Sequence, residues 1–274
     1  MRLFVFGLGY TATRLAAELR AQGWTVTGTT RDTFADRVKV AEQLAQASHV
    51  LSSVPPAGDG DPVLDGWGHA LDGAKRWIGY LSSTGVYGDT GGAWVDEDTP
   101  TGTGRRTARS EADAAWLNKQ ARVFRLPGIY GPGRSLLDRI RIRCPARIDI
   151  PGQVFSRIHA DDIVSGVIAG LTAPPGAYNL ADDCPAPQSD IVAFACRLAG
   201  CPVPPLVPLD IAELSPQARA FYGENRRVSN LKAKRVLGWR PRYADYRLGL
   251  RALSASTSPA TVSTAPAPAY HDQR

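Results

Sequence analysis

The stretch Arg2-Leu3-Phe4-Val5-Phe6-Gly7-Leu8-Gly9-Tyr10-Thr11-Ala12 decides the fold of this chain. Its apolar start predicts a buried strand, and the glycines that follow predict a tight turn into a helix that ends near Gly23. A second strand-like run, Thr25 to Thr30, comes directly after this helix and ends at Arg31. A strand, a glycine turn, a helix and a strand in this order predict the opening βαβ unit of a nucleotide-binding fold.

Small residues at three positions give this turn its chemistry. Gly7 permits the sharp turn off the strand, Gly9 lets the backbone approach a pyrophosphate, and Ala12 is small enough for the helix to pack on the strand. The first N–H groups of the helix then face the phosphates with the positive end of the helix dipole. The sequence therefore predicts dinucleotide contacts at Gly7, Gly9, Tyr10, Thr11 and Ala12.

The residue at the end of the second strand indicates which dinucleotide is bound. An acidic residue there accepts hydrogen bonds from the ribose of NAD, whereas an arginine, here Arg31, suits the 2′-phosphate of NADP. A solvated surface arginine is the alternative interpretation, and Asp32, one residue later, leaves NAD open. We predict NADP as the preferred cofactor.

Composition and charge narrow the class of protein. The chain has 274 residues, 43% of them hydrophobic, and a net charge of +6. Because its arginines are scattered and lack interleaved aromatic residues, we expect no nucleic-acid partner. No apolar run is long enough to span a membrane and no leader-like segment precedes the first strand, so we expect a cytoplasmic protein without a membrane partner. Four irregularly spaced cysteines, with no C-x-x-C pair or histidine cluster, indicate thiols and no metal site.

The segment after Arg31 is too short for the usual helix and third strand of a doubly wound fold. Phe34 to Gln46 fits a single helix, or a short strand at Val38–Val40 followed by a helical turn. In the strand order 3-2-1-4-5-6 the third strand lies at an edge, so its loss leaves the inner pairings intact. We expect that this strand is missing.

The rest of the chain predicts alternating strands and helices. Strands are expected at His49–Val54, Trp77–Ser83, Ala121–Leu126 and Tyr178–Leu180, and helices at Asp65–Lys75, Thr107–Lys119, Leu136–Arg143, Ile163–Leu171 and Ser189–Ala199, with a surface loop at Gly91–Gly104. Asp161 or Asp162 is expected to cap one of these helices, and Ser189 another.

These elements predict a Rossmann-type, doubly wound parallel α/β fold with a smaller C-terminal lobe on the substrate side. We expect a single unit over residues 1–253, in which 1–150 are mainly dinucleotide-binding and 151–253 form mainly the substrate-side lobe, with the two parts interleaved. Residues 254–274 are rich in Ser, Thr, Ala and Pro, which predicts a disordered tail.

Several landmarks occur in a characteristic order. They are the glycine turn, Ser82-Ser83-Thr84-Gly85-Val86-Tyr87-Gly88, Arg125-Leu126-Pro127-Gly128-Ile129-Tyr130-Gly131-Pro132-Gly133, the stretch from His159 to Ile163, and Leu237-Gly238-Trp239. Together they resemble the short-chain dehydrogenase/reductase superfamily, in particular its extended, epimerase/dehydratase-like branch and the atypical members close to it. The resemblance covers residues 1–253 and implies an NAD(P)-dependent enzyme.

The resemblance also implies site residues. In this family a Ser or Thr three residues before the Val-Tyr-Gly triplet holds the substrate oxygen, and that position is Ser83 here. The loop after the sixth strand resembles the family segment that covers the nicotinamide ring. Two residues after the fourth strand lie where the family lines the cofactor, and Ser82 is expected beside it. The cofactor contacts implied in this way are Val54, Pro55, Ser82, Pro127, Gly128 and Ile129.

The Tyr-x-x-x-Lys pair of the family is replaced in this sequence. Counting from Ser83, the tyrosine position falls on Thr107 and the lysine position on Glu111. An aliphatic hydroxyl is a much weaker acid than a phenol, and a neighbouring carboxylate raises its pKa further. We keep Ser83, Thr107 and Glu111 as the candidate catalytic positions.

Other acid–base groups are Tyr87, Asp113, Tyr130 and His159, of which the histidine is more simply interpreted as an exposed or capping residue. Two functions follow. The first is an NADP-preferring oxidoreductase or epimerase that acts on a small hydroxyl- or carbonyl-bearing substrate, with hydride transfer at the nicotinamide. The second is a catalytically silent NADP-binding sensor or scaffold, which the missing pair favours. Either a monomer or a homodimer is compatible with the sequence.

Overall fold

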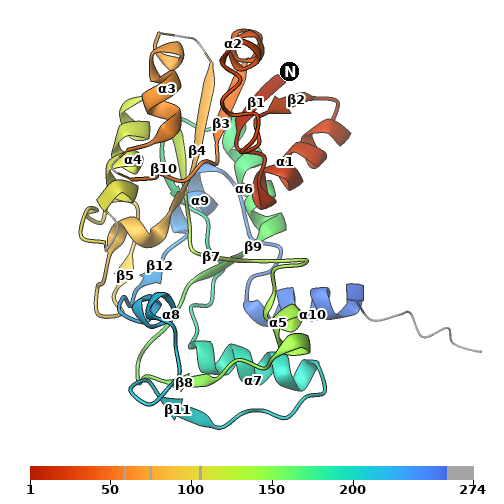
Figure 1. Cartoon of the computed structure of the whole chain (residues 1–274), viewed down its shortest axis with the longest axis vertical. Coiled ribbons are helices and arrows are strands. Elements are labelled where there is room, and N and C mark those ends of the chain that lie inside the picture. The colour runs from red at the N-terminus through yellow and green to blue at the C-terminus, as the bar shows by residue number, and fades with distance from the viewer. Residues whose placement is uncertain (59, 74–75, 105–106, 258–274) are drawn as a thin grey trace, which may run out of the picture.

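A computed structural model describes residues 1–58, 60–73, 76–104 and 107–257. At its centre lies a six-stranded sheet with the order β10-β6-β4-β3-β1-β2 (Figure 1). Every neighbouring pair is parallel. The strands are β1 (Arg2–Phe6), β2 (Thr25–Gly28), β3 (His49–Ser52), β4 (Trp77–Ser83), β6 (Arg122–Leu126) and β10 (Gly176–Asn179). This sheet confirms the predicted Rossmann-type α/β fold.

Helices cover both faces of the sheet. On one face lie α1 (Tyr10–Ala21) and α6 (Ala160–Ala169), and on the other lie α2 (Arg37–Ala45), α3 (Pro62–Leu71) and α4 (Thr107–Asn118). Their apolar side chains form two cores that sandwich the strands, because each helix presents one apolar stripe to the sheet. The cores hold the C-terminal ends of β1, β3, β4 and β6 at a common edge.

The third strand of the usual doubly wound fold is missing, as expected. The chain passes from β2 through α2 to β3, which pairs with β1 on its other side, so β2 is an edge strand. Residues 37–45 form a single helix capped by the Asp36 side chain, so the alternative of a strand at Val38–Val40 is wrong. The strand order reverses between β1 and β3, and parallel sheets bind ligands at such a switch point.

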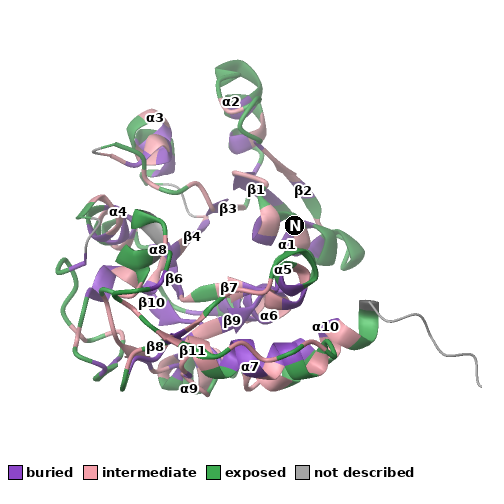
Figure 2. Cartoon of the chain, turned by 60° about the horizontal axis from the view of Figure 1, so that its bottom comes forward, coloured by how far each residue is buried: buried purple, intermediate pink, exposed green. Residues whose placement is uncertain are grey.

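A second lobe extends from the C-terminal edge of the sheet (Figure 1). It contains paired strands β7 (Gly128–Tyr130) and β9 (Arg157–His159), paired strands β8 (Arg147–Asp149) and β11 (Leu206–Pro208), and helices α5 (Leu136–Ile142), α7 (Gln188–Leu198) and α10 (Tyr246–Thr257). The three helices share one apolar core, and Figure 2 shows α7 buried on one side and exposed on the other. Shorter elements complete the fold: η1 (Thr84–Tyr87), β5 (Trp94–Val95), η2 (Gly170–Thr172), α8 (Pro216–Phe221), β12 (Arg227–Val228) and α9 (Leu231–Val236).

Two predicted helix caps are wrong. Helix α6 begins at Ala160, and its cap is His159, whose Nδ1 accepts a hydrogen bond from the backbone N–H of Asp161 at 3.2 Å. The Asp162 carboxylate instead accepts from the backbone N–H groups of Arg242 and Tyr243. Helix α7 follows Pro187, which gives no side-chain cap, so Ser189 lies inside the helix.

Three predicted boundaries also change. Helix α3 begins at Pro62, earlier than expected, because Asp61 caps it through the N–H groups of Val63 and Leu64. The predicted loop at 91–104 contains β5, which pairs with β12. Helix α10 continues to Thr257, so residues 254–257 are helical and not part of a tail, while 258–274 lie outside the described residues. Among the described residues, no helix has the length and apolar character needed to cross a membrane.

Candidate active site

A cavity of about 570 Å³ lies at the C-terminal edge of the sheet, at the switch point. The start of α1, the loop after β3, the end of β4, the β6–β7 connection and the segment near α8 all contribute to its walls. Its lining includes Gly9, Tyr10, Thr11, Ala12, Ser53, Pro55, Ser82, Ser83, Thr84, Arg109, Pro127, Gly128, Ile129, Arg134, Phe221 and Arg226. The structure therefore gathers most of the implied cofactor positions around one space.

The N-terminus of α1 opens into this cavity without a cap. No side chain of the described residues bonds to its first N–H groups, and the residue before the helix is Gly9. A Cβ added at Gly9 would meet no atom within 4 Å, so the backbone here faces open space. Uncapped helical N–H groups and the positive end of the helix dipole suit an anion such as a pyrophosphate.

Gly7 shapes the turn from behind the cavity. Its φ of +85° lies in the left-handed region, and an added Cβ would lie 2.9 Å from Cγ2 of Val54. Its backbone N–H donates to Oγ1 of Thr29 at 3.1 Å, and its carbonyl accepts from the Ser53 hydroxyl. These contacts fix the turn, and Val54 packs against it behind the cavity. The next residue, Pro55, lines the cavity itself.

Arg31 lies just after β2, at the open edge of the sheet, and its side chain is exposed. The neighbouring turn is closed by the backbone N–H of Thr30, which donates to Oγ1 of Thr33 at 2.8 Å. Arg31 thus lies beyond the C-terminal end of β2, the strand next to β1. Binding of the 2′-phosphate of NADP at this position stays a prediction.

Ser83 ends β4 and caps the short helix η1. Its hydroxyl is half-buried, lines the cavity, and accepts a hydrogen bond from the backbone N–H of Gly85 at 3.1 Å. Within the described residues this hydroxyl has no acceptor, so its own proton is free to point to a ligand oxygen. The preceding hydroxyl, that of Ser82, donates at 2.5 Å to the buried Asp113 carboxylate instead.

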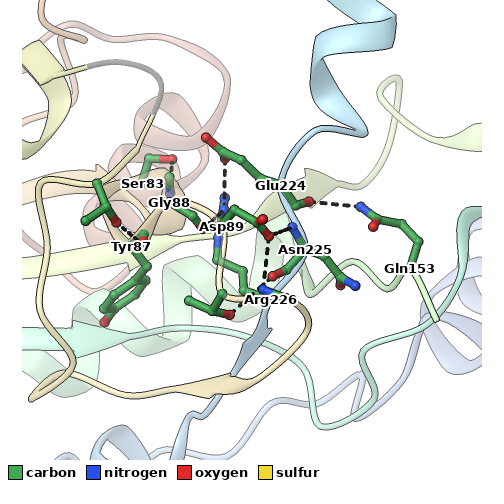
Figure 3. A network of polar contacts seen from close by, with 12 residues as sticks. Ser83, Tyr87, Gly88, Asp89, Gln153, Glu224, Asn225 and Arg226 are labelled. Carbon is green, nitrogen blue, oxygen red and sulfur yellow. Dashed lines mark hydrogen bonds and ion pairs between the residues drawn. The ribbon is translucent and has the colours of Figure 1, made fainter.

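A polar network holds the wall beside Ser83 in place (Figure 3). The Arg226 guanidinium donates to the carbonyl of Gly88 at 2.6 Å and to the Glu224 carboxylate at 2.8 Å. Next to it, the backbone N–H of Asn225 donates to Asp89 at 2.8 Å. These bonds join the segment before β12 to the loop after η1, so that Arg226 faces the cavity at a fixed position.

The two positions that replace the family's catalytic pair lie on the first turns of α4. Thr107 and Glu111 are both exposed, and the described lining of the cavity includes neither of them. Arg109, between them, lines the cavity. A guanidinium is always protonated in proteins, so Arg109 can stabilise negative charge but cannot act as a proton donor.

Two other acid–base candidates are fixed in the sheet interior. Asp113 pairs with Arg125 at 2.7 Å, and both side chains are almost fully buried. Arg125 also donates to the hydroxyl of Tyr87, which donates in turn to Asn179 at 2.8 Å. Burial raises the pKa of Tyr87 to about 12. Because their polar atoms pair with Arg125 and Asn179, Asp113 and Tyr87 join α4 and η1 to strands β6 and β10.

Tyr130 and His159 lie in the second lobe, on the paired strands β7 and β9. Burial lowers the pKa of His159, which is capping as expected but buried rather than exposed. Burial also raises the pKa of Tyr130 well above its usual range. The Tyr130 hydroxyl is buried without a hydrogen-bond partner, and its ring lines a second cavity.

The sequence did not indicate four residues of the cavity wall: Arg109, Arg134, Phe221 and Arg226. They come from segments far apart in the chain, so no local pattern marks them. Of the four, Arg134 has a feature in the sequence that could indicate it, because it directly follows the Gly131–Gly133 turn. Its guanidinium lies 5.5 Å from the centre of the Tyr10 ring, at the start of α1.

Comparisons with known proteins give the family. No family model matches the chain. A conserved protein of unknown function from Silicibacter pomeroyi is 43% identical, with a TM-score of 0.85 over 93% of this chain and 98% of that one. A protein from Methylobacillus flagellatus, assigned as an NAD-dependent epimerase/dehydratase, is 26% identical with a TM-score of 0.70 over the same shares.

A curated relative from a Streptomyces species, 3-diazoavenalumate denitrifying reductase, is 26% identical over 91% of this chain and 99% of its own length. This relative and the two structures each match nearly the whole chain. The parallel sheet and the glycine turn before α1 agree with the family named for the Methylobacillus flagellatus structure. The chain is an atypical member of the extended, epimerase/dehydratase-like branch of the short-chain dehydrogenase/reductase superfamily.

Proposed function

We propose that this protein is an NAD(P)-dependent oxidoreductase or epimerase with a preference for NADP, which acts on a small hydroxyl- or carbonyl-bearing substrate. The observation that carries the proposal is a single cavity whose lining includes both the uncapped start of α1 and the hydroxyl of Ser83. The names of the relatives, an NAD-dependent epimerase/dehydratase and a reductase, support the same class of chemistry.

The residues around the cavity fit a dinucleotide. Gly9 leaves open space beside the free N–H groups of α1, and the guanidinium groups of Arg109, Arg134 and Arg226 line the cavity, the last of them paired with Glu224. Phosphate groups are bound by this combination of backbone donors and positive charge. A bound nicotinamide ring would supply or accept the hydride.

Within this proposal, the chain itself orients the substrate and excludes water. Ser83 donates a hydrogen bond to the substrate oxygen, because its hydroxyl accepts from Gly85 and keeps its own proton free. Arg109 stabilises negative charge that develops on that oxygen. Pro127 and Ile129 cover the reacting face and keep bulk water away.

A catalytically silent NADP-binding sensor or scaffold is the second candidate, favoured by the exposed positions of Thr107 and Glu111. Ser83→Ala separates the two. In an enzyme this variant keeps its affinity for NADPH but loses turnover in assays of NADPH consumption with a panel of carbonyl compounds. In a silent protein, the wild type and the variant bind NADPH equally and neither consumes it.

The NADP preference is tested by titrating NADPH and NADH by fluorescence against the wild type and Arg31→Ala. Loss of one solvent-exposed contact to the 2′-phosphate should weaken NADPH binding by about 1–2 kcal/mol, roughly 5- to 30-fold, and leave NADH unchanged. Arg235→Ala, which removes an exposed arginine on α9, is the control and should leave both affinities unchanged. Equal weakening of the two cofactors in Arg31→Ala contradicts the assignment.

A further inference from the structure

A second cavity, of about 490 Å³, lies in the second lobe between α5, α7, α10 and the β7–β9 pair. Its walls are mostly apolar and aromatic, with side chains that include Ile129, Tyr130, Ile191, Phe221, Tyr246 and Leu250. It shares Gly128, Ile129, Arg134 and Phe221 with the cavity at the end of the sheet. A small apolar ligand body in the second cavity therefore lies next to the proposed nicotinamide site.

Three arginines line this apolar space: Arg134 and Arg139, which are exposed, and Arg157, which is partly buried. Arg157 lies on β9, and its Nη1 donates to the carbonyls of Phe155 at 2.7 Å and Ala186 at 3.1 Å. Within the part of the chain that the structure describes, no carboxylate oxygen lies within 4.0 Å of its guanidinium. Burial lowers its pKa to about 10, so that Arg157 is still charged at neutral pH.

The nearby carboxylates do not neutralise this charge. Asp138 lines the cavity, but its carboxylate accepts the backbone N–H and the hydroxyl of Ser135 in a capping box. Asp182 is buried with Oδ2 unpaired, and burial raises its pKa to about 8, so that it carries a proton at neutral pH. A partly buried cation without a counter-ion is costly to fold around.

Tyr130 lines the cavity, but its hydroxyl has almost no accessible surface and lies against Gly249 of α10, so it is not open to a ligand. Pockets for small ligands combine apolar walls with a few polar groups that fix the orientation of the ligand. An unneutralised guanidinium, that of Arg157, in a mostly apolar space is matched by a ligand with one carboxylate and an apolar body.

We propose that the second cavity binds an apolar organic acid whose carboxylate pairs with Arg157 and whose body packs against Phe221, Tyr246 and Leu250. This inference rests on the proposed function, since it names the substrate class of the same active site. Arg157 pairs in register with Gly128 across β7 and β9, and a Cβ added at Gly128 would lie 3.7 Å from Cγ of Arg157. The carboxylate of the acid therefore lies near the boundary that the two cavities share at Gly128, and its apolar body extends into the second cavity.

The test measures binding by isothermal titration calorimetry, without and with saturating NADP. The probes are 4-hydroxycinnamate, its methyl ester and UDP-glucose, each titrated into the wild type and Arg157→Gln. The matched control is Arg147→Gln, because Arg147 lies in the same lobe, is also partly buried, and also donates to two carbonyls, those of Ser189 and Pro204, but does not line this cavity.

The proposal expects the acid to bind the wild type and Arg147→Gln alike, and Arg157→Gln about 10- to 100-fold more weakly, since a charge-assisted bond is lost. The ester should bind weakly to all three proteins. Equal binding of acid and ester, acid binding that survives Arg157→Gln, or tight UDP-glucose binding that excludes the acid would each overturn it.

The cofactor titration distinguishes failure of the proposed function from failure of the proposed acid site. NADPH affinity should be the same in the wild type and in Arg157→Gln, which also shows that the variant folds. If the wild type fails to bind NADPH or NADH but binds the acid through Arg157, the proposed function fails and the acid site stands. If the cofactor binds and the acid does not, the acid site fails alone.

Discussion

Two arginines on neighbouring parts of the molecule have opposite surroundings. Arg125, in the central sheet, is buried with Asp113 at 2.7 Å and also contacts the Tyr87 hydroxyl, so that its charge is neutralised within the fold. Arg157, on β9 of the second lobe, contacts two carbonyls and faces an apolar cavity without a carboxylate partner among the described residues. The first arginine is part of the structure, whereas the second is available to a ligand.

The same contrast separates the two lobes. In the sheet, Asp113, Arg125, Tyr87 and Asn179 satisfy one another and hold four elements in fixed register. In the second lobe, Arg157 has no such carboxylate partner among the described residues. Within the described chain, buried polar atoms without partners occur in both parts, at Ser52 and Ser110 as well as at Tyr130 and Asp182, so the contrast lies in how the two arginines are neutralised.

The largest expected effect is on the sheet. Asp113→Asn keeps the shape of the side chain but leaves Arg125 buried without its counter-ion, which should lower the free energy of unfolding by about 3–5 kcal/mol. Urea denaturation measures this loss. The control is Asp72→Asn, which breaks the exposed pair with Lys119 and should cost less than about 1 kcal/mol. If the two variants lose the same free energy of unfolding, the buried pair of Asp113 and Arg125 stabilises the fold no more than an exposed pair does.

Asp182 should make the free energy of unfolding depend on pH in the direction opposite to that of most acidic residues. Its pKa is raised from 3.8 to about 8 in the folded protein, so that the folded state holds a proton that the unfolded state releases. Its contribution to stability is therefore present below pH 4 and is lost as the pH rises to about 8. Asp182→Asn does not titrate and should gain on the wild type as the pH rises through this range, by up to about 1.4 kcal/mol for each pH unit.

Thermal or urea unfolding of both proteins at a series of pH values checks this expectation. A difference between them that is constant from pH 4 to pH 8 would show that Asp182 is ionised in the folded protein. It would then be available as a counter-ion for Arg157 and would weaken the contrast between the two arginines.

The smallest expected effect on stability belongs to Arg157. Arg157→Gln loses two hydrogen bonds to carbonyls but also removes a cation without a counter-ion, so the free energy of unfolding should change by less than about 1 kcal/mol. Urea denaturation beside Asp113→Asn gives the direct comparison. A loss of 3 kcal/mol or more, as expected for the sheet variant, would make Arg157 a structural residue as well.

Local sequence pattern was sufficient for much of the fold. The strand predicted at Trp77–Ser83 has the same bounds in the structure, and the helix that starts at Thr107 differs at its end by one residue. The loss of the third strand could be predicted because too few residues separate β2 from β3 to hold both a helix and a strand. The caps were harder, because His159 caps α6 with a ring nitrogen and lies outside the usual set of capping residues.

The binding residues were less accessible to sequence reasoning. Arg109, Arg226 and Phe221 meet at the cavity although they come from α4, the segment before β12 and α8. In the sequence Arg157 is one basic residue among many, and its importance depends on the lack of a carboxylate partner among the described residues, which is a property of the tertiary structure. The role expected for Ser83 came from the family resemblance, and the structure adds that its hydroxyl has no acceptor among the described residues.

The central claim is that the uncapped start of α1 binds the diphosphate of a nicotinamide cofactor, and thermal unfolding tests it most directly. NADPH or NADH at about 100 times its Kd should stabilise the wild type by about 2.7 kcal/mol and raise its Tm by several degrees. Gly9→Val, which places a side chain in open space at an ordinary backbone conformation, should keep the native Tm and show no rise. A wild-type Tm that stays constant with both cofactors at saturating concentrations would contradict the account.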